Sequence, residues 1–171
     1  FDAEKVLRSI EEYKVTHMYL PPTALYQCLA SPELDKHDYS SLKIFILVGS
    51  PCSPEKLRQA VEVFGPCMCQ SYGQVECPMI VAWFPPEDVA RFAKDAPEKL
   101  ASCGKVTRSI KVALLDDDGK PVPKGEAGEI CVRGVLVSHS YFEKPEETAE
   151  VRKFGWHHTG DVGKFDDEGY L

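Results

Sequence analysis

Residues 43–74 have the sequence KIFILVGSPCSPEKLRQAVEVFGPCMCQSYGQ, and they decide the fold class. The stretch opens with a continuous apolar run, which is typical of a strand buried on both faces of a parallel sheet. Residues 53–55, Ser-Pro-Glu, then open a helix, because serine caps, proline suits the first turn and glutamate favours the positive end of the helix dipole. Gly65 ends this helix in a left-handed cap. Residues 66–71 predict the next strand.

The residues before this stretch continue the same alternation. Apolar residues recur at helical spacing within residues 2–13, which predicts an amphipathic helix. A short, mostly apolar strand is expected over residues 15–20, where two prolines stop it, and a second helix over residues 23–30. Strands and helices that alternate with short links predict right-handed crossovers and a parallel sheet.

The second half of the chain has a different pattern. Residues 105–115 predict a strand that ends in an Asp-Asp-Asp-Gly turn, which has strong hairpin chemistry. Residues 128–134 predict another strand, and residues 164–171 carry a second turn of this kind. We therefore expect an α/β chain. A partial parallel-type sheet with flanking helices occupies residues 1–100, and a small antiparallel β-barrel-like subdomain occupies residues 101–171.

Composition excludes several classes of protein. The chain has 171 residues, a formal net charge of −7 and 10% aromatic residues. The negative charge argues against a nucleic-acid partner, because phosphate binding needs clustered cations. No apolar run reaches the length of a transmembrane segment, which is about 18–20 residues. Recurrent apolar stretches and aromatic residues argue against disorder.

The cysteines and histidines predict no structural metal site. Seven cysteines occur without a Cys-x-x-Cys pair, so we expect reduced, mostly buried thiols in a cytoplasmic protein. The adjacent His157 and His158 make an improbable metal-binding pair. Residues 116–118 lack the spacing of a calcium loop, and Gly104-Lys105 lacks the context of a Walker phosphate loop.

Three short segments are candidates for a ligand site. Gly49, Ser50 and Pro51 follow the buried strand, at the strand end where ligands bind in parallel sheets. Residues 71–76, Ser-Tyr-Gly-Gln-Val-Glu, combine an aromatic face, a glycine and a carboxylate that could bind a hard cation. Asp161 follows Thr-Gly and could accept two hydrogen bonds from a diol. Each segment also has a plain structural alternative: a strand–helix turn, a core tyrosine with a solvated glutamate, and a turn aspartate.

Four motifs stand in order along the chain: Val-Gly-Ser-Pro (48–51), Ser-Tyr-Gly-Gln-Val-Glu (71–76), Gly-Glu-Ile-Cys-Val-Arg-Gly (128–134) and Gly-Trp-His-His-Thr-Gly-Asp (155–161). Together they resemble the successive signatures of the adenylate-forming superfamily, which includes acyl-CoA synthetases, luciferases and peptide-synthetase adenylation domains. The resemblance runs from about Thr16 to Leu171, and the Trp-x-His-Thr-Gly-Asp form is similar to the CoA-ligase branch.

The resemblance implies an acyl-CoA synthetase that uses ATP, Mg²⁺ and coenzyme A. A carboxylic acid is activated to acyl-AMP, and CoA then displaces AMP. Glu76 would hold magnesium and serve catalysis, Tyr72 would stack on adenine, and Asp161 would bind the ribose hydroxyls. The full set of expected cofactor-binding residues is Gly49, Ser50, Pro51, Ser71, Tyr72, Gly73, Gln74, Val75 and Asp161.

Two departures from the family pattern leave alternatives open. Val75 stands where the family commonly has threonine, and a lost hydroxyl contact would cost about 1–3 kcal/mol. The family's phosphate loop and its lid with the catalytic lysine have no counterpart in these residues. We therefore expect part of a large N-terminal domain that is inactive alone. The alternatives are an adenylation domain that serves a carrier-protein thiol and a non-catalytic nucleotide-binding module.

Overall fold

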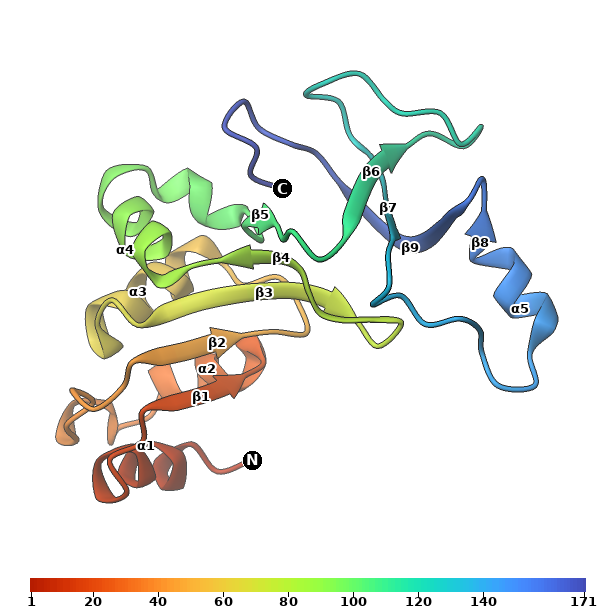
Figure 1. Ribbon diagram of the computed structural model, residues 1–171. Helices are drawn as coiled ribbons and strands as arrows, with labels where there is room; N and C mark the ends of the chain where they lie inside the picture. The colour runs from red at the N-terminus through yellow and green to blue at the C-terminus, as the bar shows by residue number, and fades with distance from the viewer. The chain divides into compact units, whose positions relative to one another are not determined.

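The computed structural model describes residues 1–78 and 80–171. The chain divides into two compact units (Figure 1). Unit 1 comprises Phe1–Ser71 and Phe84–Cys103, and unit 2 comprises Tyr72–Trp83 and Gly104–Leu171. No helix in the described residues has the length and apolar character needed to cross a membrane.

Unit 1 contains the parallel strands that the sequence predicts. Strand β1 (His17–Leu20) pairs in parallel with β2 (Ile44–Leu47), and β2 pairs in parallel with the first part of β3 (Met68–Gln74). The five-stranded sheet has the order β1-β2-β3-β4-β5, where β4 is Cys77–Phe84 and β5 is Lys105–Val106. The α/β fold class is therefore confirmed. The helical elements of unit 1 are α1 (Ala3–Glu12), α2 (Pro22–Leu29), η1 (Leu34–Lys36), α3 (Pro54–Phe64), α4 (Pro86–Asp95) and η2 (Pro97–Ala101).

Strand β2 is covered more on one face than on the other. Phe45 and Leu47 are buried, whereas Ile44 and Ile46 are only half-buried. The expectation of a strand buried on both faces therefore holds fully for the face of Phe45 and Leu47 and only in part for the face of Ile44 and Ile46. The Phe45 ring packs edge-on against Phe64 at a centroid distance of 5.3 Å.

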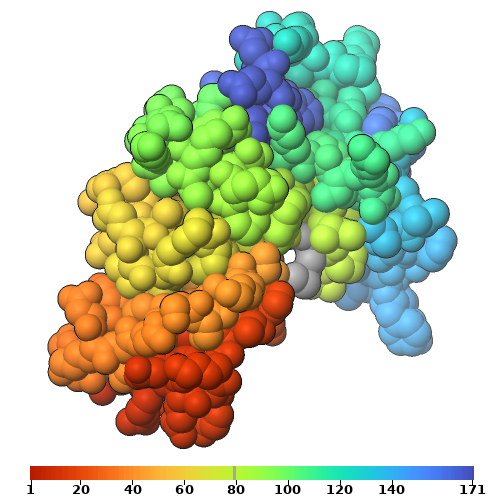
Figure 2. Space-filling view, turned by 60° about the vertical axis from the view of Figure 1, so that its left-hand side comes forward, coloured from red at the N-terminus to blue at the C-terminus, as the bar shows by residue number. Residues whose placement is uncertain are grey.

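The helix ends follow the sequence signals with one exception. Asp2 accepts a hydrogen bond from the Lys5 backbone N–H (3.0 Å) and caps α1, whose exposed side chains lie at the surface in red in Figure 2. Gly65 has φ +84° and closes α3. Ser53, however, makes no side-chain cap. Its backbone N–H donates to the Tyr26 hydroxyl at 2.8 Å, a contact that does not involve the serine side chain.

Unit 2 contains a four-stranded antiparallel sheet of order β6-β7-β9-β8. In the described residues this sheet is open and forms no closed barrel. The strand expected over residues 105–115 is divided, because β5 pairs with β4 whereas β6 pairs with β7. The elements of unit 2 are β4 (Cys77–Phe84, whose last residue belongs to unit 1), β5 (Lys105–Val106), β6 (Lys111–Leu115), β7 (Gly128–Arg133), α5 (Pro145–Glu150), β8 (Arg152–Lys153) and β9 (Trp156–Gly163).

The pairing of β7 with β9 contains a bulge. Glu129 pairs with Val162 and Cys131 pairs with His158, so Ile130 faces three residues of β9 instead of one. A bulge of this kind bends a strand and redirects side chains. The three residues of β9 that lie opposite Ile130 are Thr159, Gly160 and Asp161.

Candidate nucleotide-binding site

The Asp161 carboxylate is the centre of a hydrogen-bonded cluster in unit 2. Its Oδ2 accepts hydrogen bonds from the Tyr72 hydroxyl (2.6 Å) and from Nε2 of Gln74 (3.3 Å). Tyr72 and Gln74 are two residues apart in β3, and so they point to the same face of the strand. The structure therefore brings together three of the residues that the sequence predicts for nucleotide binding.

The backbone around Asp161 is fixed by the bulge. The Thr159 hydroxyl donates to the Ile130 carbonyl (2.7 Å) and accepts from the Asp161 N–H (3.1 Å). Gly160 has φ +76°, a left-handed conformation that favours glycine. Its N–H donates to Oε1 of Glu129 at 2.9 Å. These contacts hold an exposed carboxylate on a well-defined backbone.

Gln74 connects Asp161 to the buried histidine His157. The Gln74 Nε2 also donates to the Thr159 carbonyl at 2.7 Å, and its Oε1 lies 3.3 Å from Nε2 of His157. Because an amide oxygen only accepts, the His157 Nε2 must carry the proton in this contact. The ring thereby sets the amide orientation that directs the Gln74 NH₂ group toward Asp161.

Burial keeps His157 neutral. The residue is 2% exposed, and its Nδ1 has no hydrogen-bond partner among the described residues. Burial, followed by the positive charge of Arg152, lowers the His157 pKa below its ordinary value. The sequence alone does not predict this role of His157. The available signal was weak: a histidine at an inward-facing position of a strand that also carries the Thr-Gly-Asp turn.

Glu76 lies in the turn that follows β3 and has its own partner. Its Oε1 accepts a hydrogen bond from the Tyr141 hydroxyl at 2.8 Å. Its own backbone N–H, and then the Tyr141 hydroxyl, hold the Glu76 pKa below the usual range for a carboxyl group. Glu76 is therefore an ionised, half-buried carboxylate at neutral pH, and its oxygen atoms are the ligand type that magnesium prefers.

Other predicted residues lie elsewhere in the chain. Gly49, Ser50 and Pro51 are exposed residues of unit 1 that follow β2, and Gly49 has φ +98°. Ser71 is buried at the end of the first segment of unit 1. Val75 is 91% exposed, in the turn after β3. Gly73 lies between Tyr72 and Gln74 in β3.

The Asp161 cluster has the chemistry of a diol-binding site. Tyr72 and Gln74 occupy Oδ2, whereas Oδ1 of Asp161 has no partner among the described residues. An ionised carboxylate accepts strong hydrogen bonds from neighbouring hydroxyl groups. Oδ1 of Asp161 can therefore accept hydrogen bonds from hydroxyl groups of a ligand.

Relatives with known names cover nearly the whole of this chain. The sequence is 41% identical over 170 residues to a medium/long-chain-fatty-acid–CoA ligase of Mycobacterium tuberculosis, with 99% of this chain and 29% of the relative aligned. Thus the chain spans about a third of the length of the curated relatives it matches.

Solved structures agree with these relatives. The amide bond synthetase McbA from Marinactinospora thermotolerans has a TM-score of 0.89 and 37% identity, over 100% of this chain and 34% of that chain. The o-succinylbenzoate coenzyme A synthetase MenE from Bacillus subtilis, solved in complex with ATP and a magnesium ion, has a TM-score of 0.82 and 32% identity, over 100% and 34% of the two chains.

One family model matches most of the chain. The sequence model of the family described as AMP-binding enzyme matches residues 1–142. This range includes β3 with Tyr72 and Gln74 and the Glu76 turn, and Asp161 follows in the part that the relatives also cover. The chain belongs to the AMP-binding enzyme family.

Proposed function

We propose that the full natural protein is an AMP-forming acid–thiol ligase. A carboxylate oxygen of the acid attacks the α-phosphorus of ATP, and pyrophosphate leaves. The thiolate of coenzyme A then attacks the acyl carbon, and AMP leaves with the bonding electrons. The family assignment and the 41% identity to a fatty-acid–CoA ligase support this reaction.

The observation that carries the proposal is the Asp161 carboxylate with its two donors in β3. Tyr72 and Gln74 fix Oδ2 and leave Oδ1 for hydroxyl groups of the ligand. We assign the ribose of ATP to this carboxylate. The diol would donate to Asp161, and the bulge would keep the carboxylate in place without reorganisation during the reaction.

The remaining predicted residues would surround the rest of the nucleotide. The Tyr72 ring would stack on adenine, since its hydroxyl contact with Asp161 holds the ring next to the ribose position. Gly49, Ser50 and Pro51 would line the adenine and acyl side, as the resemblance implies, and Ser71 stays an expected cofactor-binding residue. Gly73 would give the acyl carboxylate room near the backbone. Val75 would face the phosphates without a hydroxyl donor.

Glu76 is our candidate magnesium ligand. Its ionised carboxylate matches the hard-oxygen preference of magnesium, and Tyr141 holds one of its oxygen atoms. Magnesium, when bound, supplies positive charge that offsets the charge developing on the phosphates. Glu76 and Tyr141 would position the ion. The similar MenE was solved with ATP and a magnesium ion, which supports magnesium as the ion that accompanies ATP.

A second candidate concerns the acceptor of the acyl group. McbA, an amide bond synthetase, is 37% identical to this chain, which is within the range of the CoA ligases. In this alternative, an amine attacks the acyl-AMP and forms an amide. A carrier-protein thiol is a third acceptor. All three share the adenylation step, and so the acceptor does not change the role that we assign to Asp161.

The first test is acyl-AMP formation by the full natural protein and its Asp161→Asn variant. Fatty, arylacetic and cinnamic acids are supplied with MgATP, and acyl-AMP is measured by mass spectrometry before CoA, an amine or a carrier protein is added. We expect the variant to lose about 10–150-fold in kcat/KM for ATP, the effect of about 1.5–3 kcal/mol for a hydrogen bond to a charged group.

Asp117→Asn is the matched control, because Asp117 is an exposed aspartate of the β6–β7 connection. It should leave kcat/KM for ATP unchanged. If Asp161→Asn has the same kcat/KM for ATP as the wild type, the assignment of the ribose to Asp161 is wrong. If the folded wild-type protein binds ATP but adenylates none of the acids, the ligase proposal is wrong and the non-catalytic nucleotide-binding alternative holds.

Two further proposals concern organisation. We propose that residues 1–100 act as the α/β adenine-binding part and residues 101–171 as the antiparallel part that ends with the ribose-binding aspartate. We also propose a cytoplasmic location, because six of the cysteines are buried thiols of the kind expected in a reducing compartment.

A further inference from the structure

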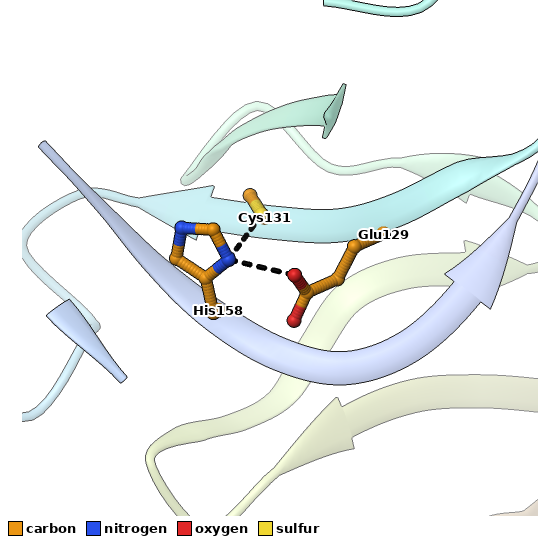
Figure 3. A group of neighbouring side chains, drawn as sticks. All are labelled: Glu129, Cys131 and His158. Carbon is orange, nitrogen blue, oxygen red and sulfur yellow. Dashed lines mark hydrogen bonds and ion pairs between the residues drawn. The ribbon is translucent and has the colours of Figure 1, made fainter. Parts of the chain in front are cut away.

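Three potential metal ligands from two adjacent strands of unit 2 converge on one point (Figure 3). Glu129 and Cys131 are two residues apart in β7, and His158 of β9 is the cross-strand partner of Cys131. The His158 Nδ1 lies 2.7 Å from Oε2 of Glu129 and 3.4 Å from Sγ of Cys131. All three ligand atoms lie within 4.8 Å of one another.

The surroundings of His158 favour a cation at Nδ1. Its other nitrogen, Nε2, lies 3.3 Å from the Lys153 carbonyl, which accepts only and therefore requires a proton on Nε2. A neutral ring in this tautomer directs the Nδ1 lone pair at the Glu129 carboxylate. Two hydrogen-bond acceptors, the Nδ1 lone pair and the carboxylate oxygen, face each other at 2.7 Å in that arrangement, and a proton or a metal ion between them removes the repulsion.

Both Glu129 and His158 have the supporting contacts that metal ligands commonly have. A metal-binding histidine usually donates its second ring N–H to a carbonyl or carboxylate, as His158 does to Lys153. The second carboxylate oxygen of Glu129 is held by the Gly160 N–H at 2.9 Å. An ion could therefore use Oε2 while Oε1 keeps the contact with Gly160.

The donor set selects the kind of ion. One sulfur, one imidazole nitrogen and one carboxylate oxygen suit zinc, which binds all three atom types and accepts water as its fourth ligand. Magnesium and calcium prefer oxygen ligands alone. Cys131 is buried, whereas Glu129 and His158 are partly exposed, so an ion can reach the site from the solvent side.

We propose that Glu129, Cys131 and His158 form a binding site for a zinc-type divalent cation. As the Sγ–metal bond forms, the Cys131 thiol releases its proton to solvent, and any proton on the His158 Nδ1 is released as well. Burial, followed by the Glu129 charge, raises the pKa of the Cys131 thiol to about 12, and the site is therefore weaker than one built from exposed thiols.

Occupancy of the site would link β7 to β9 at the bulge that precedes Asp161. Two strands joined by a metal resist separation, so binding to the folded state raises the melting temperature. The proposal is independent of the ligase reaction, because none of the three side chains is placed in contact with the nucleotide. The site can therefore be tested whether or not acyl-AMP is formed.

The test is a titration of the metal-free full natural protein with ZnCl₂, followed by calorimetry and by thermal melting. Three proteins are compared: the wild type, Cys131→Ser, and the control Cys77→Ser. Cys77 is another buried cysteine of unit 2 that has no place in the cluster. We expect zinc to raise the melting temperature of the wild type and Cys77→Ser, and the affinity to fall at least tenfold in Cys131→Ser.

Cobalt provides a readout that does not depend on stability. Thiolate-to-cobalt charge-transfer absorption should appear with CoCl₂ in the wild type and in Cys77→Ser, and disappear in Cys131→Ser. Circular dichroism of the metal-free proteins checks that each variant is folded. A folded wild type without zinc binding, or equal zinc affinity in Cys131→Ser, would overturn the proposal. Loss of the cobalt band in Cys77→Ser alone would overturn it as well.

Discussion

The two units differ in the part that one buried polar side chain plays. Both interiors are mainly apolar, with Phe45, Leu57 and Phe64 among the buried residues of unit 1, and burial raises the pKa of thiols in both units. In unit 2 the buried His157 takes part in a chain of hydrogen bonds that reaches Asp161 through Gln74. Changes in unit 1 should therefore alter stability first, and changes in unit 2 should alter binding first.

The largest effect is expected for Phe45→Ala in unit 1. Phe45 is 1% exposed and packs against Phe64, so its truncation leaves a cavity. We expect the free energy of unfolding to fall by about 3–5 kcal/mol in urea titrations. Phe142→Ala is the control, because Phe142 is 86% exposed and should change this free energy by less than about 0.5 kcal/mol. If both variants lose a similar amount of unfolding free energy, burial of Phe45 in unit 1 does not determine the stability of the protein.

A smaller effect, on binding, is expected for Tyr72→Phe in unit 2. The substitution keeps the ring but removes the hydroxyl that donates to Asp161 at 2.6 Å. The affinity for ATP, measured by calorimetry, should fall by about 1–2 kcal/mol, because the carboxylate loses one of its two fixed donors. Tyr13→Phe is the control, since Tyr13 is an exposed tyrosine of unit 1. If both variants bind ATP as the wild type does, Tyr72 does not position Asp161.

The smallest effect is a pH dependence of stability that depends on His157. Its pKa is lowered in the folded state, so the unfolded chain takes up a proton first as the pH falls through the ordinary value of 6.5. The contribution of neutral His157 to stability is therefore fully present above about pH 6.5 and is lost as the pH decreases.

His157→Gln should flatten the fall in melting temperature between pH 7 and pH 5, while glutamine can still donate to Gln74. His139→Gln is the matched control, because His139 is exposed in the same unit. An equally steep pH profile in His157→Gln and in the wild type would show that His157 is not kept neutral by burial.

Local signals were sufficient to predict much of the fold. The apolar run around Phe45 and the helix that ends at Gly65 were read from neighbouring residues, and the parallel pairing of β1, β2 and β3 confirms them. The errors occurred where tertiary contacts compete with a local signal. Ser53 has the residue type of a cap, but its side chain makes no capping hydrogen bond, and the residue is linked to α2 through its backbone N–H and the Tyr26 hydroxyl.

The site was predictable only in part, because its contacts depend on which residues of β7 and β9 pair with each other. The residue types of Tyr72 and Asp161 were clear from sequence motifs, but their hydrogen bond joins positions 89 residues apart. The contacts of His157 with Gln74 and of His158 with Glu129 depend on the bulge between β7 and β9. A shift by one residue would turn alternate side chains to the opposite face, and no local pattern reveals it.

The bulge also sets a limit on insertions and deletions. Because Ile130 faces Thr159, Gly160 and Asp161 together, the number of residues between His158 and Val162 determines which side chains follow on each face of β9. Deletion of one of the three would reverse the alternation of side chains in the rest of β9. Residues 123–127 of the β6–β7 connection, in contrast, are exposed and belong to no strand, so a change of length is tolerated better there. The three-residue segment therefore acts as a spacer of fixed length, and natural or engineered length variation should concentrate elsewhere in unit 2.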